Sequence, residues 1–286
     1  MMIGLTERTQ NKINNNDVNY TKNKANHFLK FLKRIHKEIL NHEIINNNKF
    51  TKQWATKKLS KKDIQRFIIQ FSVFSNQFLI AQLQKVINSD SIESARESKE
   101  ILANEIGVIF KSTKRKHDDC DDNNKSNKSE LVSTTGTVDG GTYRFAAAHF
   151  EWLCKIANKL DLEFNDIGKR CHGHDSTLFF CDKLIELYGG TDYNKCVAVS
   201  YAIENWAAAG FWKDLIKGLK NYNLKANIKV PLSFFTWHDK IEDQHAEHTQ
   251  EELEELYFTK EINEDDFIKN GNDMLDALLV FWNGLL

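Results

Sequence analysis

Apolar residues recur at helical spacing along most of the chain, which predicts a protein built of helices. From 23 to 45, large apolar residues lie three and four positions apart, as they do on one face of an α-helix. Ser60 is placed to cap a long, mostly apolar helix over 61–87, and the aromatic content of that helix predicts a central position. Further helices are expected at 90–110, 143–160, 176–190, 194–220, 231–258 and 265–286. With no internal repeat and no convincing run of strands, the pattern predicts an all-α bundle of about eight helices.

Two polar stretches interrupt this pattern. Residues 1–21 are polar and aperiodic, which predicts a disordered N-terminal tail ahead of a single domain over 22–286. Residues 111–142 form a polar insert with almost no large apolar side chain, as is typical of a disordered loop or an active-site flap. We expect the latter part of this insert, 134–145, to be ordered and to close over a substrate.

Composition limits the classes of partner. The 286 residues carry a formal net charge of -1, so the chain has no general electrostatic attraction to nucleic acid. No apolar run approaches the roughly 20 residues that span a bilayer, and the N-terminus lacks the apolar core of a secretory signal. We therefore expect a cytoplasmic protein without a membrane or nucleic-acid partner. The five cysteines show no CxxC spacing and are expected to be free thiols.

The stretch WHDKIEDQHAEH, residues 237–248, concentrates histidines and acidic residues in one predicted helix. His238, Glu242 and His245 stand at i, i+4 and i+7, so their side chains share one stripe of an α-helix. A stripe of imidazole, carboxylate and imidazole is either a solvated face or half of a metal site. His248 falls off that stripe and is expected at the surface or behind the ligands.

Three more polar residues stand where the helical pattern calls for apolar ones. His149 interrupts an apolar stripe, Glu204 is surrounded by small residues, and Glu105 lies near the end of a predicted helix. Taken singly, they fit a core histidine, a hydrogen-bonded buried glutamate and a surface carboxylate. A buried carboxylate is costly unless it is paired or binds a cation. Together with the stripe, four helices supply three carboxylates and three imidazoles, a mixed set that suits iron or manganese better than a structural zinc site.

The order of these residues resembles the heme-oxygenase-like diiron oxidases and oxygenases. The segments that carry the resemblance are LANEIG, AAHFEWL, AIENWA and HDKIEDQH, and the resemblance covers roughly residues 25–285. It implies a heme-oxygenase-like helical fold without heme and two Fe(II) ions, with manganese as the other candidate. The ligands that it implies are Glu105, His149, Glu204, His238, Glu242 and His245. The sequence departs from the family where Glu242 replaces a frequent Asp and where the polar insert separates Glu105 from His149.

The resemblance also implies the class of reaction. Such a protein activates O2 to oxidise a small organic metabolite that is amino-acid-, amine- or fatty-acid-like. Tyr201, one turn before Glu204, is the candidate catalytic residue, because near an oxidising metal pair it could donate electrons or be modified itself. Aromatic residues close to the ligands either line a substrate pocket or belong to the core: Trp206, Phe234, Phe235 and Trp237.

Other interpretations stay open at this point. A metal-free enzyme of the TenA or PqqC kind, or a protein-interaction module, would use the same fold without the six ligands, and a homodimer is open to either. A ferritin-like diiron bundle would need two Glu-x-x-His motifs, and only Glu242-x-x-His245 is present. The run RCHGHD, residues 170–175, is either a zinc-binding cluster or a loop that leads into a helix.

Overall fold

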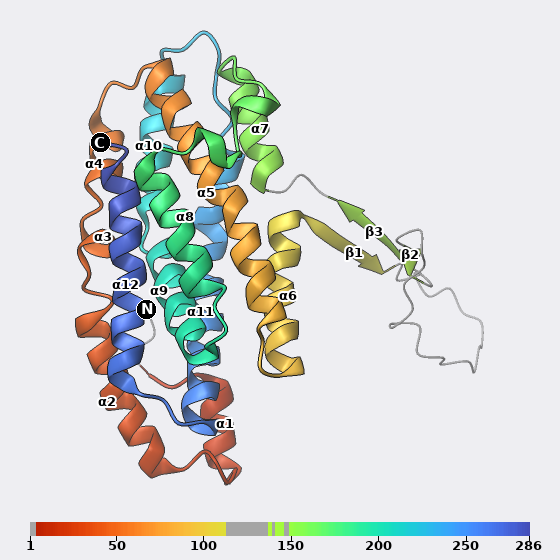
Figure 1. Ribbon diagram of the computed structural model, residues 1–286, viewed down its shortest axis with the longest axis vertical. Helices are drawn as coiled ribbons and strands as arrows, with labels where there is room; N and C mark the ends of the chain where they lie inside the picture. Colours follow the sequence, from red (N-terminus) through yellow and green to blue (C-terminus); the bar gives the residue numbers. More distant parts are fainter. Residues whose placement is uncertain (1–3, 113–136, 139–140, 146–148) are drawn as a thin grey trace.

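Helices make up most of the chain (Figure 1). The computed structural model describes residues 4–112, 137–138, 141–145 and 149–286, and within these it describes side chains except at 93, 97, 100, 104, 109–112, 137–138, 141–145 and 241–245. The helices are α1 (Glu7–Asn14), α2 (Lys22–Glu38), α3 (Glu43–Asn46), α4 (Lys49–Thr56), α5 (Lys61–Ile87), α6 (Ile92–Ile106), α7 (His149–Lys159), α8 (Asp175–Tyr188), α9 (Tyr193–Ala207), α10 (Phe211–Asn223), α11 (Ser233–Thr259) and α12 (Glu264–Asn283). Two short 3₁₀ turns, Phe164–Asp166 and Arg170–His172, precede α8. The all-α class is confirmed, with more helices than the eight or so expected.

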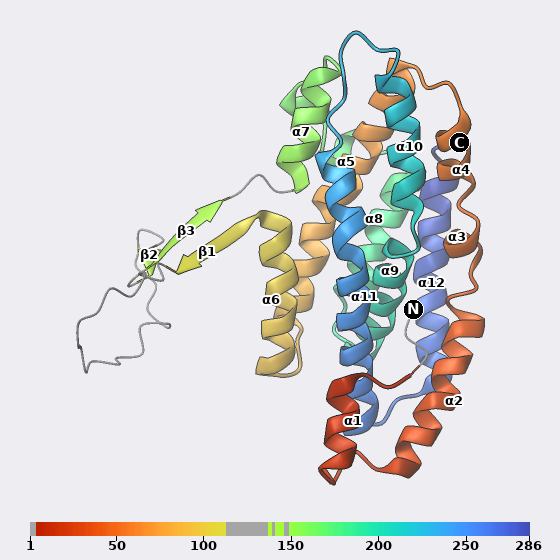
Figure 2. The ribbon, with the colours of Figure 1, turned by 180° about the vertical axis from the view of Figure 1, so that it is seen from behind.

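The long helices run side by side as a bundle, which Figures 1 and 2 show from opposite faces. Helix α5 packs against α6, α7 and α8, while α9 packs against α11 and α12. This arrangement places α6 and α7 on the opposite side of the bundle from α2 and α3. Within the described residues, no helix has both the length and the apolar character needed to cross a bilayer.

Helix α5 begins where the sequence predicts. The Ser60 hydroxyl accepts a hydrogen bond from the Asp63 backbone N–H, and the Asp63 carboxylate accepts one from the Ser60 backbone N–H. This capping box satisfies two of the amide groups that every helix start leaves unpaired. Phe67 and Phe71 of α5 are buried and contact the ring of Trp282 from α12. The aromatic load of α5 therefore lies in the core, as expected.

The expected helix over 194–220 is divided into α9 and α10. The division falls at Gly210, whose φ of 84° lies in the left-handed region that glycine adopts at little cost. Because the chain turns at this residue, the aromatic residues after it pack beside those before it. The ring of Phe211 stacks on Trp206 at 4.5 Å between ring centroids.

The N-terminal residues differ from the predicted disordered tail. Residues 7–14 form α1, and the Thr6 side chain caps it by accepting a hydrogen bond from the Thr9 N–H. The segment is anchored by Glu254 of α11, which is fully buried and accepts hydrogen bonds from the backbone N–H and the hydroxyl of Thr6. A contact between residues this far apart in sequence overrides the polar, aperiodic local pattern.

The polar insert also differs from the expected loop in its described parts. Strands β1 (Val108–Ser112), β2 (Thr137–Val138) and β3 (Gly141–Phe145) form an antiparallel sheet in the order β1-β3-β2. Gly107, with φ of 70°, ends α6 and turns the chain into β1. Residues 113–136 and 139–140 lie outside the described residues. The strands extend away from the bundle (Figures 1 and 2), so the described part of 134–145 does not close over a cavity.

Candidate functional site

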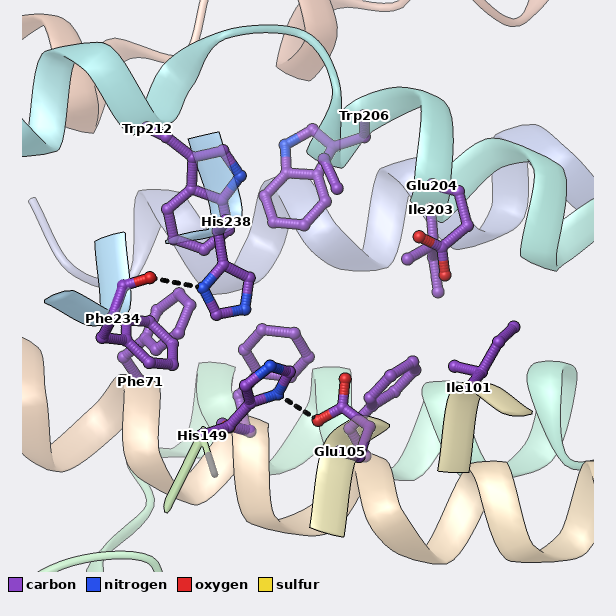
Figure 3. Close-up of a pocket in the computed structure, with 14 residues that line it drawn as sticks. Phe71, Ile101, Glu105, His149, Ile203, Glu204, Trp206, Trp212, Phe234 and His238 are labelled. Atoms are coloured by element: carbon purple, nitrogen blue, oxygen red, sulfur yellow. Dashed lines mark hydrogen bonds and ion pairs between the residues drawn. The ribbon is translucent and has the colours of Figure 1, made fainter. Parts of the chain in front are cut away.

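Four of the six predicted metal ligands line one cavity in the bundle (Figure 3). The cavity encloses about 600 Å³ between atoms, including its part open to solvent. Glu105 comes from the last turn of α6, His149 from the start of α7, Glu204 from α9 and His238 from α11. Glu105 and His149 lie on one side and Glu204 and His238 on the other. Four helices distant in sequence thus bring two carboxylates and two imidazoles together.

Glu105 orients the ring of His149. Nδ1 of His149 lies 2.5 Å from Oε2 of Glu105, and the two side chains are 7% and 11% exposed. A carboxylate at this position keeps the proton on Nδ1 and leaves the lone pair on Nε2. Nε2 of His149 is buried and has no hydrogen-bond partner among the described residues. A buried ring nitrogen with a fixed tautomer is the arrangement that histidine ligands have.

The ring of His238 is fixed in a similar way by its own helix. Its Nδ1 lies 2.7 Å from the carbonyl oxygen of Phe234, one turn earlier, so Nδ1–H donates to that carbonyl. The second ring nitrogen lies on the side facing His149 (Figure 3), and the two ring centroids are 4.5 Å apart. The ring of Trp212 stacks on the ring of His238, with 4.6 Å between the ring centroids. His238 is therefore held by a hydrogen bond and by aromatic packing.

Glu204 points from α9 into the cavity toward the side that bears Glu105 (Figure 3). Its side chain is buried within a helix face of small residues, as the sequence predicts. The buried ammonium of Lys85, from α5, lies near it and hydrogen-bonds Ser200, one turn before Glu204. Burial is the largest influence on the pKa of Lys85 and lowers it. The charge of Glu252 raises this pKa, and the charge of Glu204 also raises it.

Aromatic and aliphatic side chains form most of the remaining wall. Besides the four candidate ligands, the lining residues are Phe71, Phe74, Ser75, Phe78, Ile101, Ile203, Trp206, Ala207, Trp212 and Phe234. The sequence left it open whether four aromatic residues line a pocket or belong to the core. Trp206 and Phe234 line the cavity, whereas Phe235 and Trp237 are not among its lining residues. Trp212, two residues after Gly210, was missed, because the helical pattern of the sequence shows no break at that glycine.

The remaining predicted site residues are Tyr201, which lies away from the cavity, and Glu242 and His245, whose side chains are not among the described ones. The Tyr201 hydroxyl donates to Oε1 of Gln250 at 3.3 Å, and the residue is not among those lining the cavity. Glu242 and His245 belong to α11, but their side chains lie outside the described ones. Among the described residues, no three His, Cys, Asp or Glu side chains come close enough to form a preformed metal site.

The second histidine cluster, RCHGHD, does not form such a group either within the described residues. His172 Nε2 lies 2.8 Å from the backbone carbonyl oxygen of Asn165, and Cys171 is exposed. The run supplies a 3₁₀ turn and the first residue of α8. His248 of α11 is exposed, in keeping with its place off the ligand stripe.

Solved structures share this arrangement of helices. A CADD-like protein of unknown function from Nostoc punctiforme superposes with a TM-score of 0.55 at 17% identity, over 91% of this chain and 96% of that one. A TenA homolog from Pseudomonas syringae pv. tomato gives a TM-score of 0.56 at 10% identity, over 94% and 95% of the two chains. The chain has the heme-oxygenase-like helical fold. At these identities the similarity shows the fold alone. No protein-family model matches the chain, and no curated protein does.

Proposed function

We propose that this protein is a non-heme diiron oxidase or oxygenase that uses O2 to oxidise a small organic molecule. The observation that carries the proposal is the cavity that Glu105, His149, Glu204 and His238 all line. A cavity walled by aromatic side chains and holding a few convergent polar groups is typical of a ligand or active site. The similarity to a CADD-like protein supports the fold in which such a site would be built.

The residues present fit iron. Carboxylates and imidazoles are the ligands that Fe(II) accepts. The buried Nε2 of His149 has no hydrogen-bond partner among the described residues, and a metal would satisfy its lone pair. Glu242 and His245 would complete the set, because the backbone of α11 places them one and two turns after His238. We propose the same six residues as the ligands of two Fe(II) ions, with Mn(II) as the other candidate.

The protein's own contribution is positioning and exclusion of water. The hydrogen bonds of Glu105 to His149 and of His238 to the Phe234 carbonyl set the two imidazoles before any ligand arrives. The aromatic wall would limit the access of water to them. Bound Fe(II) would supply the electrons that reduce O2. We also propose Tyr201 as an electron donor to the site. It lies on α9 one turn before Glu204 but does not line the cavity, so it would not touch a substrate.

Oxygen uptake tests this proposal. Protein reconstituted with Fe(II) without air should consume O2 faster than the same concentration of free Fe(II) when mixed with aerated buffer, and His149→Ala should slow the uptake to the rate of free Fe(II). His248→Ala is the matched control, because it removes an exposed histidine from α11 and should leave uptake unchanged. Equal uptake by wild-type protein and His149→Ala would refute an iron site at this cavity.

A metal-free enzyme of the TenA kind, or an interaction module, would have the same fold and is the alternative. It predicts that the protein neither retains iron nor takes up O2. Under that alternative, His149→Ala and His248→Ala would both behave as the wild-type protein does with iron.

A further inference from the structure

Two tryptophans of the cavity wall carry unsatisfied hydrogen-bond donors. Trp206 and Trp212 are 3% and 4% exposed, and both line the cavity. The indole Nε1 of each is buried without a hydrogen-bond partner among the described residues. An indole N–H usually finds a partner when it is buried, because leaving it unpaired costs the loss of its hydration. Two such donors in one wall therefore indicate a group that the protein itself does not supply.

The two donors converge. Figure 3 shows the indole nitrogens of Trp206 and Trp212 turned toward each other above His238. Both rings are held by packing: Trp206 stacks on Phe211 at 4.5 Å, and Trp212 lies 4.5 Å from the same Phe211 ring and stacks on His238 at 4.6 Å. Packing thus fixes the direction of both N–H groups before a ligand binds. The position beside His238 places a bound acceptor next to the candidate metal ligands.

The charges around the cavity favour a neutral acceptor. None of its described lining residues is a lysine or an arginine, and two are carboxylates. A buried anion without a cation partner would be costly, whereas a neutral oxygen needs only donors. The remaining wall beyond the tryptophans is apolar, with Phe74, Phe78 and Ile101 among its members.

We propose that Trp206 and Trp212 form a subsite for the neutral carbonyl oxygen of a small aromatic or alkyl ligand. The two N–H groups donate to that oxygen, and the apolar part of the ligand lies against the phenylalanines. Identifying this ligand as the substrate rests on the proposed function, but the subsite itself does not require a metal. It would make a ketone, an ester or an amide a better ligand than a zwitterionic amino acid.

Acetophenone and ethylbenzene, which differ by one carbonyl oxygen, test the subsite on the metal-free full-length protein. Trp212→Phe and Trp206→Phe should each weaken acetophenone binding by about two- to tenfold, the range for one neutral hydrogen bond, and leave ethylbenzene binding unchanged. Trp54→Phe is the matched control. Its indole is also buried, but it donates to the Leu215 carbonyl oxygen and does not line the cavity, so neither ligand should respond.

Indole nitrogen NMR of the wild-type protein gives a measurement that does not depend on a variant folding. Acetophenone should shift two tryptophan indole N–H resonances downfield, and ethylbenzene should not. Failure of acetophenone to bind, equal weakening of both ligands by the Phe variants, or unshifted indole resonances would each overturn the proposal. Because no metal is added, such a failure is distinct from a failure to bind iron or take up O2.

Discussion

The buried ammonium group of Lys85 allows a stability prediction with a defined size. Its side chain is 3% exposed and its Nζ lies 3.3 Å from Oε2 of Glu252, which is 11% exposed. Nζ also hydrogen-bonds the Ser200 hydroxyl and lies 5.2 Å from the centroid of the Tyr188 ring. Lys85→Met keeps the length and apolar stem of the side chain but leaves the Glu252 carboxylate without its cation. Breaking a buried pair in this way costs about 3–5 kcal/mol.

The pKa of Lys85 predicts how this cost depends on pH. Burial is the largest single cause and would lower the pKa, but the charges of Glu252, Tyr188 and Glu204 and the hydrogen bond to Glu252 together outweigh it. The pKa is therefore raised above its ordinary value of 10.5. A lysine whose pKa rises on folding stabilises the folded state fully below its unfolded-state pKa. That contribution is lost only as the pH rises through the folded-state pKa. The cost of Lys85→Met should therefore be the same at about pH 6 and about pH 8.

Urea denaturation followed by far-UV circular dichroism measures the cost. The double variant Lys85→Met/Glu252→Gln should be more stable than Lys85→Met alone, because it removes the orphaned charge and keeps an acceptor for the Tyr193 hydroxyl. The coupling between the two sites should be about 2 kcal/mol. Lys269→Met is the control, since Lys269 pairs with Asp273 at the exposed surface and should cause no measurable change. Strictly additive single variants, or a Lys85→Met protein as stable as the wild type, would refute the account of this pair.

Three further predictions concern the thiols, the N-terminal helix and the helix of the proposed ligands. Iodoacetamide at about pH 8 should label the exposed Cys171 quickly and Cys181 only after unfolding, because burial raises the pKa of Cys181 to about 12; peptide mass mapping checks this, and equal labelling would contradict it. Thr6→Val should lower the free energy of unfolding by about 1.5–3 kcal/mol, since it removes a hydrogen bond to the buried carboxylate of Glu254, and it should expose the first residues to limited proteolysis; an unchanged digestion pattern would count against that anchor. Glu242→Gln should keep the fold and reduce iron retention, measured by metal analysis after desalting; retention equal to that of the wild type would place Glu242 outside the ligand set.

Local patterns were enough to predict the helices that carry the site. The capping box at Ser60 and the periodicity of the following helix predicted α5, and the polar interruptions at His149 and Glu204 predicted two of the inward-facing groups. These signals are local because a helix that buries one face has apolar residues every three or four positions along the sequence. A buried polar residue stands out against that repeat.

Features that depend on distant contacts were not predicted. Helix α1 is anchored by Glu254, which no local pattern links to Thr6. The pairing of β1 with β3 joins strands on either side of the insert. The convergence of Trp206 and Trp212 depends on the turn at Gly210, which a helical pattern without a break cannot show. In each case the deciding partner is far away in sequence or is set by one backbone angle.

Anaerobic titration with Fe(II), followed by desalting and iron analysis, tests the central proposal most directly. If the cavity is a metal centre, the wild-type protein should retain about two ions per chain. His149→Ala and Glu204→Ala should each lose most of this iron, and His248→Ala should retain all of it. Retention of less than one ion per chain by the wild type, or equal retention by all four proteins, would contradict a diiron site in this cavity.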